Sequence, residues 1–280
     1  MCSSDLIDLA QLAERCGYHR YWLAEHHGTP GLACNSPEVL IGPVAAATST
    51  IRVGSGGVML PHYSPLKVAE NFSMLASLYP GRIDLGLGRA PGTSAAVAHA
   101  LQRDRRMPPL DDFPKQLEEL FAYLDNRATN HLRAVQFTSP DVYLLGSSGQ
   151  SAVWAAELGL PYVFADFISP NGVELARFYR DNFIASERAQ RPWVGICVWA
   201  ICADTDEEAL RLSYSLRMTS LNLFRGRLIP VPTVEKAEAF LAKEGVSPEL
   251  LPQGRRILTG SPQTLKSKLE DVVRQYQADE

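Results

Sequence analysis

The sequence lacks the features that mark several large classes of protein. No apolar run reaches the ~18–20 residues of a membrane-spanning helix, and the first predicted helix is amphipathic and acidic, unlike a secretory signal. No G-x-G-x-x-G motif follows the first predicted strand, which weakens a Rossmann dinucleotide site. No G-x-S-x-G motif occurs, so a hydrolase nucleophile has little support. We therefore expect a cytoplasmic protein with no membrane partner.

Cysteine and basic charge are also scarce. The five cysteines are an odd number and widely scattered, with no CxxC pair and no Cys/His cluster at zinc spacing. They are typical of reduced thiols, and they predict no metal site. The net charge is −4, with acids and bases interspersed. Because no basic stripe is present, nucleic acid is not an expected partner.

What the sequence does contain is a regular alternation of strands and helices. Six predicted strands begin near residues 19, 52, 82, 142, 161 and 194. This order indicates a parallel sheet covered by helices, either an open doubly wound sheet or a closed (β/α)8 barrel. The 280 residues, 46% of them hydrophobic, fit one large α/β domain over 1–280 with an insertion at about 94–140.

The ends of the chain do not fit a complete barrel. The sequence starts on a predicted helix with no strand before it, and it stops on a helix just as a strand would be due. A TIM (β/α)8 barrel without strands 1 and 8 would have this order. Since those strands are neighbours in a closed barrel, their absence would leave one gap with two exposed edges. We therefore expect an incomplete barrel.

The predicted helices follow the apolar spacing. On the first of them, Leu6, Leu9, Leu12, Ala13 and Cys16 are predicted to face inward. A short strand at 135–138 and an exposed loop at 103–112 are predicted within the insertion. The helices are expected at 5–16, 37–48, 65–79, 94–102, 113–124, 150–158, 173–183, 205–224, 234–243 and 263–276.

One stretch, residues 52–92, organises the rest of the chain. It reads as strand, helix and strand in about 40 residues, a βαβ unit whose strands are parallel. Within its first strand lies Gly54-Ser55-Gly56-Gly57. Glycine weakens a strand, so three in four residues need a reason. Either the backbone packs tightly or forms a bulge here, or a flat ligand lies against it.

Polar side chains gather at the carboxyl ends of the predicted strands, where parallel α/β folds place their chemistry. Glu25-His26-His27, His62 and Arg89 each follow a strand. Histidine titrates near neutral pH, so one of these histidines is an acid–base candidate, although a lone histidine is usually structural. A metal site at Glu25-His26-His27 is disfavoured, because adjacent histidines after a strand point in different directions. Trp193 and Trp199 are better explained as core residues.

The turn Gly146-Ser147-Ser148-Gly149 also follows a strand and directly precedes a helix. Its free backbone N–H groups and the helix dipole favour a phosphate. The alternative is a plain serine N-cap. Arg89 could supply the opposite charge, and its alternative is a surface ion pair.

Four segments in the same order carry a family resemblance. The chain resembles the bacterial luciferase-like flavin monooxygenases, strongly over 6–93 and recognisably over 142–275, whereas 94–140 match only loosely. The segments are Trp22-Leu23-Ala24-Glu25-His26-His27, Ser36-Pro37-Glu38, Val53-Gly54-Ser55-Gly56-Gly57-Val58-Met59-Leu60-Pro61 and Pro80-Gly81-Arg82-Ile83-Asp84-Leu85-Gly86-Leu87-Gly88-Arg89.

The resemblance implies a TIM barrel that binds FMN, or in some branches the deazaflavin F420. By resemblance, the isoalloxazine packs on strand 52–60, with a non-proline cis peptide that corresponds to Gly56-Gly57, and His26 assists the chemistry. His62 and the 94–110 loop would line the substrate side. The residues that bind the cofactor by resemblance are Gly56, Gly57, Met59, Arg89, Ser147, Ser148 and Ser151.

The implied activity is that of an FMN-dependent monooxygenase. Reduced FMN from a separate flavin reductase would react with O2 to give a C4a-hydroperoxide, which oxygenates a small organic substrate. The first alternative is an F420-dependent hydride-transfer oxidoreductase, and the second is a non-catalytic flavin-binding paralogue. The family is often dimeric, so a homodimer is expected.

Overall fold

The computed structural model describes residues 3–32, 34–89, 95–101, 112–128, 138–169, 172–245 and 256–280. The chain divides into two compact units. The first comprises Met1–Gly28 and Leu32–Leu145, and the second comprises Thr29–Gly31 and Gly146–Glu280. The predicted loop at 103–112 and the predicted strand at 135–138 lie almost wholly outside the described residues.

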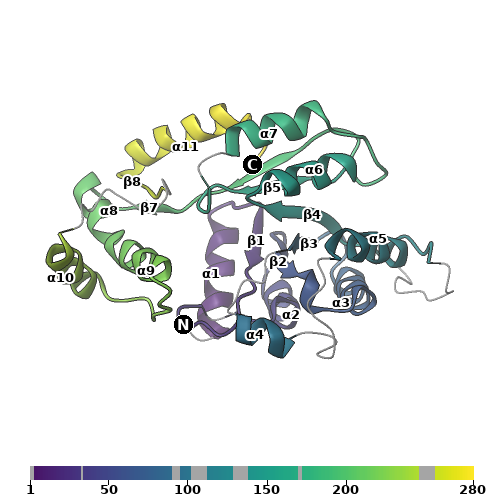
Figure 1. Ribbon diagram of the computed structural model, residues 1–280, viewed down its shortest axis with the longest axis horizontal. Coiled ribbons are helices and arrows are strands. Elements are labelled where there is room, and N and C mark those ends of the chain that lie inside the picture. Colours follow the sequence, from purple (N-terminus) through teal and green to yellow (C-terminus); the bar gives the residue numbers. More distant parts are fainter. Residues whose placement is uncertain are drawn as a thin grey trace. The chain divides into compact units, whose positions relative to one another are not determined.

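The first unit is built on parallel strands in the order β1-β2-β3-β4, and Figure 1 shows helices α2 and α3 beside them. The strands are β1 (Arg20–Leu23), β2 (Arg52–Met59), β3 (Ile83–Gly88) and β4 (Asp141–Gly146). The helices are α1 (Ser3–Arg15), α2 (Pro37–Ala47), η1 (Leu60–His62), α3 (Pro65–Leu78), α4 (Ala95–Leu101) and α5 (Phe113–Leu124).

Strands β2 and β3 approach each other unusually closely. The register between them shifts between Ser55 and Val58. A Cβ on Gly54 would lie 2.3 Å from the carbonyl oxygen of Asp84, and one on Gly57 would lie 2.6 Å from that of Gly86. Atoms of a neighbouring backbone cannot move aside cheaply, so both positions require glycine. Tight packing therefore explains two of the three glycines.

The predicted inward face of α1 is partly wrong. Leu9 and Leu12 are each 47% exposed and Cys16 is also exposed, whereas Ala10 is completely buried. The helix packs against α2. The buried face of the helix therefore includes Ala10, and Leu9 and Leu12 lie away from it. Gly17 follows the helix with φ +80°, a left-handed conformation that favours glycine.

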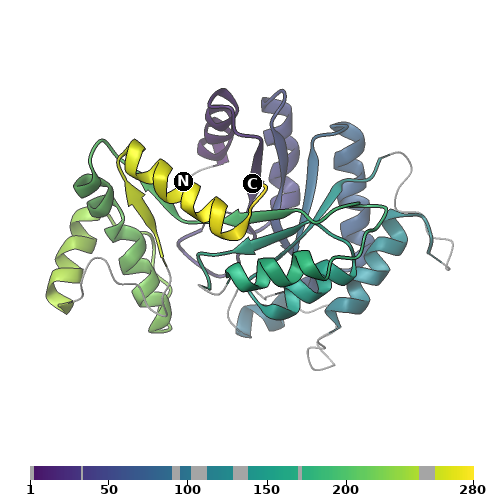
Figure 2. The same cartoon turned by 90° about the horizontal axis from the view of Figure 1, so that it is seen from above.

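The second unit contains two parallel strand pairs, β5 with β6 and β7 with β8. Its C-terminal helix α11, yellow in Figure 2, contacts β7, β8 and α7. The strands are β5 (Tyr162–Ala165), β6 (Val194–Cys197), β7 (Ala200–Cys202) and β8 (Leu258–Gly260). The helices are α6 (Gly149–Glu157), α7 (Gly172–Asp181), α8 (Asp206–Leu212), α9 (Tyr214–Phe224), α10 (Val234–Glu244) and α11 (Pro262–Tyr276).

Two predicted elements of this unit are each divided in two. The strand predicted at 194–203 changes partner, because β6 pairs with β5 whereas β7 pairs with β8, a short strand that was not predicted. Between β6 and β7, Trp199 stacks on Phe167 at a centroid distance of 5.1 Å. The helix predicted at 205–224 breaks at Ser213, whose hydroxyl donates to the carbonyl of Leu210 at 2.6 Å.

The fold is an incomplete (β/α)8 barrel, as predicted. Each strand from β1 to β6 is followed along the chain by a helix or a 3-10 turn, except β6, which is followed by β7. Its described strand pairs are parallel. Among the described residues, no helix is long and apolar enough to cross a membrane. The expectation of one domain over 1–280 stays a prediction.

Candidate functional site

A buried carboxylate lies at the carboxyl end of β1. Glu25 has no exposed surface. Its Oε2 accepts from the backbone N–H of Met59 at 2.9 Å, and its Oε1 accepts from the Tyr63 hydroxyl at 2.9 Å. The Nε2 atom of His27 lies 2.7 Å from the same Oε1. The carboxylate thus joins the ends of β1 and β2 to the turn η1.

Two histidines meet at this place. The rings of His27 and His62 contact edge to face, with centroids 5.9 Å apart and planes at 90°. We name Glu25, His27, Met59, His62 and Tyr63 the Glu25 cluster. These residues come from the ends of β1 and β2 and from η1 with the residue after it. Parallel pairing of β1 with β2 brings the two strand ends together.

The surroundings of the Glu25 cluster are poorly hydrated. Burial, followed by the charge of Glu25, raises the pKa of Tyr63 far above its usual value, so this phenol stays protonated as a donor. Burial also raises the pKa of the Glu38 carboxyl, and the charge of Glu25 acts in the same direction. The pKa of the Cys34 thiol is raised mainly by burial too. Such an environment strengthens electrostatic interactions between the groups in it.

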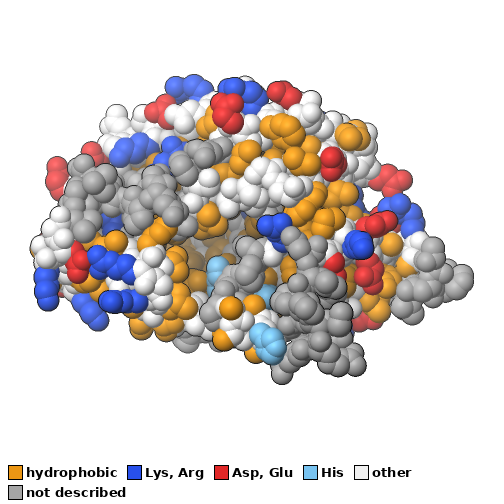
Figure 3. Space-filling model, in the orientation of Figure 1, with side chains coloured by type: hydrophobic (Ala, Val, Ile, Leu, Met, Phe, Trp, Pro, Cys, Tyr) orange, Lys and Arg blue, Asp and Glu red, His pale blue; other side chains and the backbone are white. Residues whose placement is uncertain are grey.

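His26, the predicted acid–base residue, lies next to the Glu25 cluster in the chain. Its backbone N–H donates to the carbonyl of Cys34 at 3.2 Å, and the residue is half-buried. Histidine side chains can be seen from the face drawn in Figure 3, beside hydrophobic ones. From the sequence, His26 and His62 were assigned by resemblance, His27 was counted only among the acid–base candidates, a metal site at Glu25-His26-His27 was disfavoured, and Tyr63 was not considered. An acid that directly follows an apolar strand was the available signal for Glu25.

The predicted flavin-bed glycines lie on the adjoining strand. The peptide bond between Gly56 and Gly57 is cis, as the resemblance implied. Gly57 is buried against β3, whereas Gly56 is half-buried, and a Cβ there would lie 3.1 Å from the Cβ of Trp22. Backbone without side chains is thus accessible at Gly56. This is the feature of β2 that packing against β3 leaves unexplained.

Met59 and Arg89 lie near each other at the ends of β2 and β3. The Cε atom of Met59 would lie 2.9 Å from a Cβ placed on Gly88, the last residue of β3. Arg89 follows immediately and is exposed. Thus the structure brings His26, Gly56, Gly57, Met59, His62 and Arg89 to the ends of neighbouring strands in the first unit.

The predicted serines belong to the second unit, at the start of α6. Ser148 is the N-cap, and it forms a capping box with Ser151 through bonds of 3.4 Å in each direction. The buried Ser151 hydroxyl also donates to the Ser148 carbonyl at 2.7 Å and lies 3.0 Å from the Tyr162 hydroxyl. Burial raises the pKa of Tyr162 to about 12. Ser148 therefore acts as an N-cap and remains exposed, while Ser147 is half-buried. A phosphate site at this turn stays a prediction.

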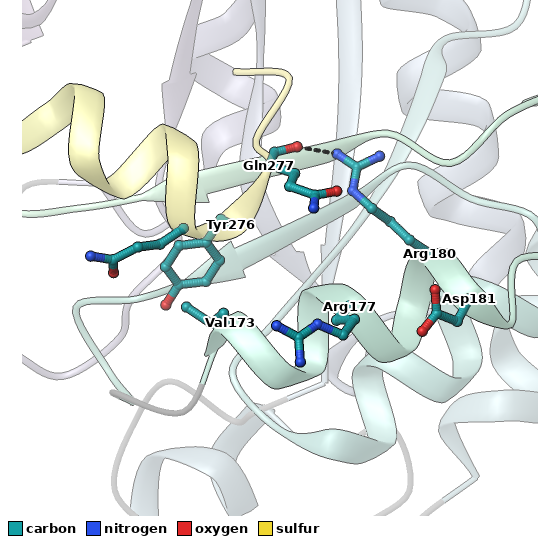
Figure 4. Close-up of a pocket in the computed structure, with 7 residues that line it drawn as sticks. Val173, Arg177, Arg180, Asp181, Tyr276 and Gln277 are labelled. Atoms are coloured by element: carbon teal, nitrogen blue, oxygen red, sulfur yellow. Dashed lines mark hydrogen bonds between the residues drawn. The ribbon is translucent and has the colours of Figure 1, made fainter.

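A separate pocket of about 250 Å³ opens in the second unit between α7 and the end of α11 (Figure 4). Its polar lining includes Arg177, Arg180 and Asp181, and Arg180 donates to the carbonyl of Gln277. None of the predicted site residues lines it. Within the part of the chain that the structure describes, no group of three or more His, Cys, Asp or Glu side chains could hold a metal ion.

Known proteins resemble this chain over almost its whole length. A family model described as luciferase-like monooxygenase matches residues 3–279. The chain belongs to the luciferase-like monooxygenase family. It is 42% identical to the luciferase-like monooxygenase of Escherichia coli (strain K12), covering 99% of this chain and 84% of that protein. It is 38% identical to the N-acetyl-S-alkylcysteine monooxygenase of Bacillus subtilis (strain 168), covering 98% and 84%.

Several solved structures share the fold. The crystal structure of apo-MsnO8 has a TM-score of 0.88 and 38% identity, over 99% of this chain and 84% of that one. The oxygenating constituent of 3,6-diketocamphane monooxygenase from Pseudomonas putida, in complex with FMN, has a TM-score of 0.70 and 18% identity, over 99% and 84%. An F420-dependent tetrahydromethanopterin reductase from Methanopyrus kandleri has a TM-score of 0.66 and 14% identity, over 98% and 88%.

Proposed function

We propose that this luciferase-like monooxygenase uses reduced FMN and O2 to oxygenate a small organic substrate. The observation that carries the proposal is the accessible, side-chain-free backbone at Gly56, beside the Glu25 cluster at the carboxyl ends of the strands. A flat aromatic ring can lie directly on such backbone. The family match over residues 3–279 supports monooxygenase chemistry at this place.

The residues present fit a flavin phosphate as well as its ring. Ser148 is exposed at the N-terminus of the nine-residue helix α6, where free backbone N–H groups favour an anion. Ser147 adds a hydroxyl group on the same turn, whereas the buried Ser151 hydroxyl would have to turn away from the Ser148 carbonyl to donate to a phosphate. Arg89 supplies an exposed guanidinium, which suits bidentate contact with phosphate oxygens. We propose the serine turn as the phosphate-binding element of the second unit, and Gly56, Gly57 and Met59 as the ring-binding element of the first unit. Arg89, in the first unit, is proposed as a phosphate ligand from the family resemblance.

When bound, reduced FMN would supply two electrons and activate O2, in the family's manner through the C4a-hydroperoxide. One oxygen atom would go to the substrate and the other would leave as water, with two protons consumed. The protein's contribution is to hold the ring, exclude water and move a proton. We assign the acid–base role to His26 and place His62 on the substrate side.

A variant at the acid–base position tests the assignment. His26→Ala should keep affinity for FMN but lower substrate oxidation by about 10²-fold or more, because a general acid–base group contributes on that order. His19→Ala is the matched control, since His19 is exposed and precedes β1. Unchanged turnover in the His26 variant would remove His26 from the mechanism.

Two other activities fit the same fold. An F420-dependent hydride transfer is supported by fold likeness alone, at 14% identity. A non-catalytic flavin-binding paralogue would bind FMN without O2-dependent turnover. Titration of the chain with reduced FMN and with reduced F420 distinguishes the F420-dependent activity from the FMN-dependent one. Measuring O2 consumption with reduced FMN bound distinguishes a monooxygenase from a non-catalytic flavin-binding paralogue.

The proposal includes two protein partners. A separate flavin reductase would supply reduced FMN, since the Pseudomonas putida relative is by its description the oxygenating constituent of its enzyme. We also propose a cytoplasmic homodimer. Helix α2 has one charged residue, Glu38, and its outer face carries Val39, which is 64% exposed. On the adjacent α3, Met74 and Leu78 are 64% and 63% exposed. Such an apolar face favours association with a second copy.

A further inference from the structure

Glu25 makes more contacts than a residue that only fills a strand end. Its two oxygen atoms face the Met59 N–H, the Tyr63 hydroxyl and Nε2 of His27, at 2.9, 2.9 and 2.7 Å. The carboxylate is completely buried, and the His27 side chain is only 12% exposed. Burying a carboxylate is costly unless its oxygens are fully hydrogen-bonded. The arrangement meets that condition only if all three neighbours donate.

The donors decide the protonation of His27. The Met59 backbone N–H can only donate, and the raised pKa of Tyr63, due first to burial and then to Glu25, keeps its hydroxyl protonated. A carboxylate that receives both bonds has only acceptor capacity left for its third neighbour. The Nε2 atom of His27 must therefore carry a hydrogen. The proton that His27 gains or loses is consequently the one on Nδ1.

We propose that Glu25 is a positioning residue that fixes His27 in the Nε2-protonated form and against His62, making His27 a second acid–base group of the site that exchanges its proton at Nδ1. The charged and titratable groups around this ring include Glu25, Glu38, His62 and Tyr63. The orienting carboxylate follows the same logic as in enzymes where an acid sets the tautomer of a histidine base. The catalytic use of this proton rests on the proposed function. The tautomer of His27 follows from the hydrogen bonds alone and does not depend on that function.

The isosteric variant Glu25→Gln gives a specific expectation. Glutamine has one acceptor oxygen, and the Met59 N–H, which cannot change, requires it. The amide NH2 group then faces the Tyr63 hydroxyl, which can accept, and Nε2 of His27, which must lose its hydrogen. We therefore expect His27 to change to the Nδ1-protonated tautomer in this variant.

The test is nitrogen-15 NMR of the chain labelled in its six histidines, with no flavin or substrate added. His27→Asn assigns the resonance by its loss. Wild type should show His27 protonated at Nε2 in the neutral form, and Glu25→Gln should show it protonated at Nδ1. Tyr63→Phe is the matched control, because it removes one donor to Oε1 but leaves the contact with His27, and it should keep the wild-type tautomer.

Two results would overturn the inference. One is a wild-type His27 that is protonated at Nδ1, and this measurement stands even if a variant fails to fold. The other is an unchanged tautomer in a folded Glu25→Gln protein. A subsequent turnover assay should show kcat about 10²-fold lower in His27→Asn. If the tautomer behaves as expected but no flavin turnover occurs in wild type, the proposed function fails and the positioning role stands.

Discussion

Replacing the buried Asp84 with asparagine should be among the most destabilising single changes in the first unit. Asp84 has no exposed surface. Its Oδ2 accepts from Arg20 at 2.9 Å and from the Trp22 indole at 2.8 Å. Its Oδ1 accepts from Arg52 at 2.8 and 2.5 Å. One carboxylate thus balances two guanidinium groups that are only 14% and 17% exposed.

The magnitude follows from what remains in the variant. Removing one partner of a buried ion pair costs about 3–5 kcal/mol, because the remaining charge is uncompensated. In Asp84→Asn, Arg52 keeps its ion pair with Asp141 at 2.6 Å, and Arg20 keeps its hydrogen bond to the Tyr143 hydroxyl at 2.9 Å. We therefore expect a loss near the lower end, about 3 kcal/mol. The activity of the folded fraction should be retained, because Asp84 lies near the amino end of β3.

The assay is urea unfolding followed by circular dichroism, with stability read from the midpoint and slope. Asp141→Asn is the matched control. Asp141 also binds Arg52, but its side chain is 64% exposed, and such pairs contribute only about 0–1 kcal/mol. Equal decreases in the free energy of unfolding in the two variants, or a decrease below about 1 kcal/mol in Asp84→Asn, would refute the reasoning.

Three further predictions concern stability and assembly. Backbone N–H groups of residues 49–51, first among them that of residue 50, lower the pKa of Glu14 from 4.5 to about 2. Glu14→Gln should therefore lower the free energy of unfolding by about 1–2 kcal/mol at neutral pH. In acid unfolding, this difference from wild type should disappear as the pH falls from 4.5 towards 2. The control variant Asp8→Asn should show no such difference. Gly54→Ala should lower the free energy of unfolding by about 1–3 kcal/mol, because the added Cβ overlaps the backbone of β3. Gly42→Ala is the control, since a Cβ there lies 3.7 Å from its nearest neighbour, Leu75. It should be neutral or stabilising in thermal unfolding. Val39→Lys should shift the proposed dimer to monomer in analytical ultracentrifugation, and an unchanged mass would exclude the α2–α3 face.

The regular elements were predictable wherever local pattern and tertiary packing agree. The helix predicted at 113–124 has those bounds in the structure, because its apolar spacing and its entry proline both favour the same helix. The prediction failed where packing decides. Residues 194–203 favour strand throughout, so the sequence predicts one strand. The structure contains two, because the second half, β7, pairs with β8. On α1, leucine spacing predicted a face that differs from the buried one, which includes Ala10.

The candidate site was predictable as a set of strand ends but not as a network. Parallel pairing places the residues after β1 and β2 together, so an acid–base role for one of the histidines there could be proposed from position. The choice of His26 came from the family resemblance. The direction in which Glu25 turns depends on donors supplied from positions 59 and 63, far away in the sequence. Similarly, the glycines of β2 were compatible with either tight packing or a bound ligand. Only the positions of the β3 backbone atoms show that packing requires glycine at Gly54 and Gly57.

The central claim is that reduced FMN binds on the half-buried, side-chain-free backbone at Gly56. Anaerobic titration of the chain with reduced FMN, in wild type and in Gly56→Ala, tests it most directly, with reduced F420 as the competing ligand. A Cβ at this position adds bulk where the ring would lie and contacts only the Trp22 side chain at 3.1 Å or beyond. The account predicts saturable binding of reduced FMN that is at least about tenfold weaker in a folded Gly56→Ala protein, a change of about 1.4 kcal/mol. Equal affinity in the two proteins, or binding of F420 but not of FMN, would contradict it.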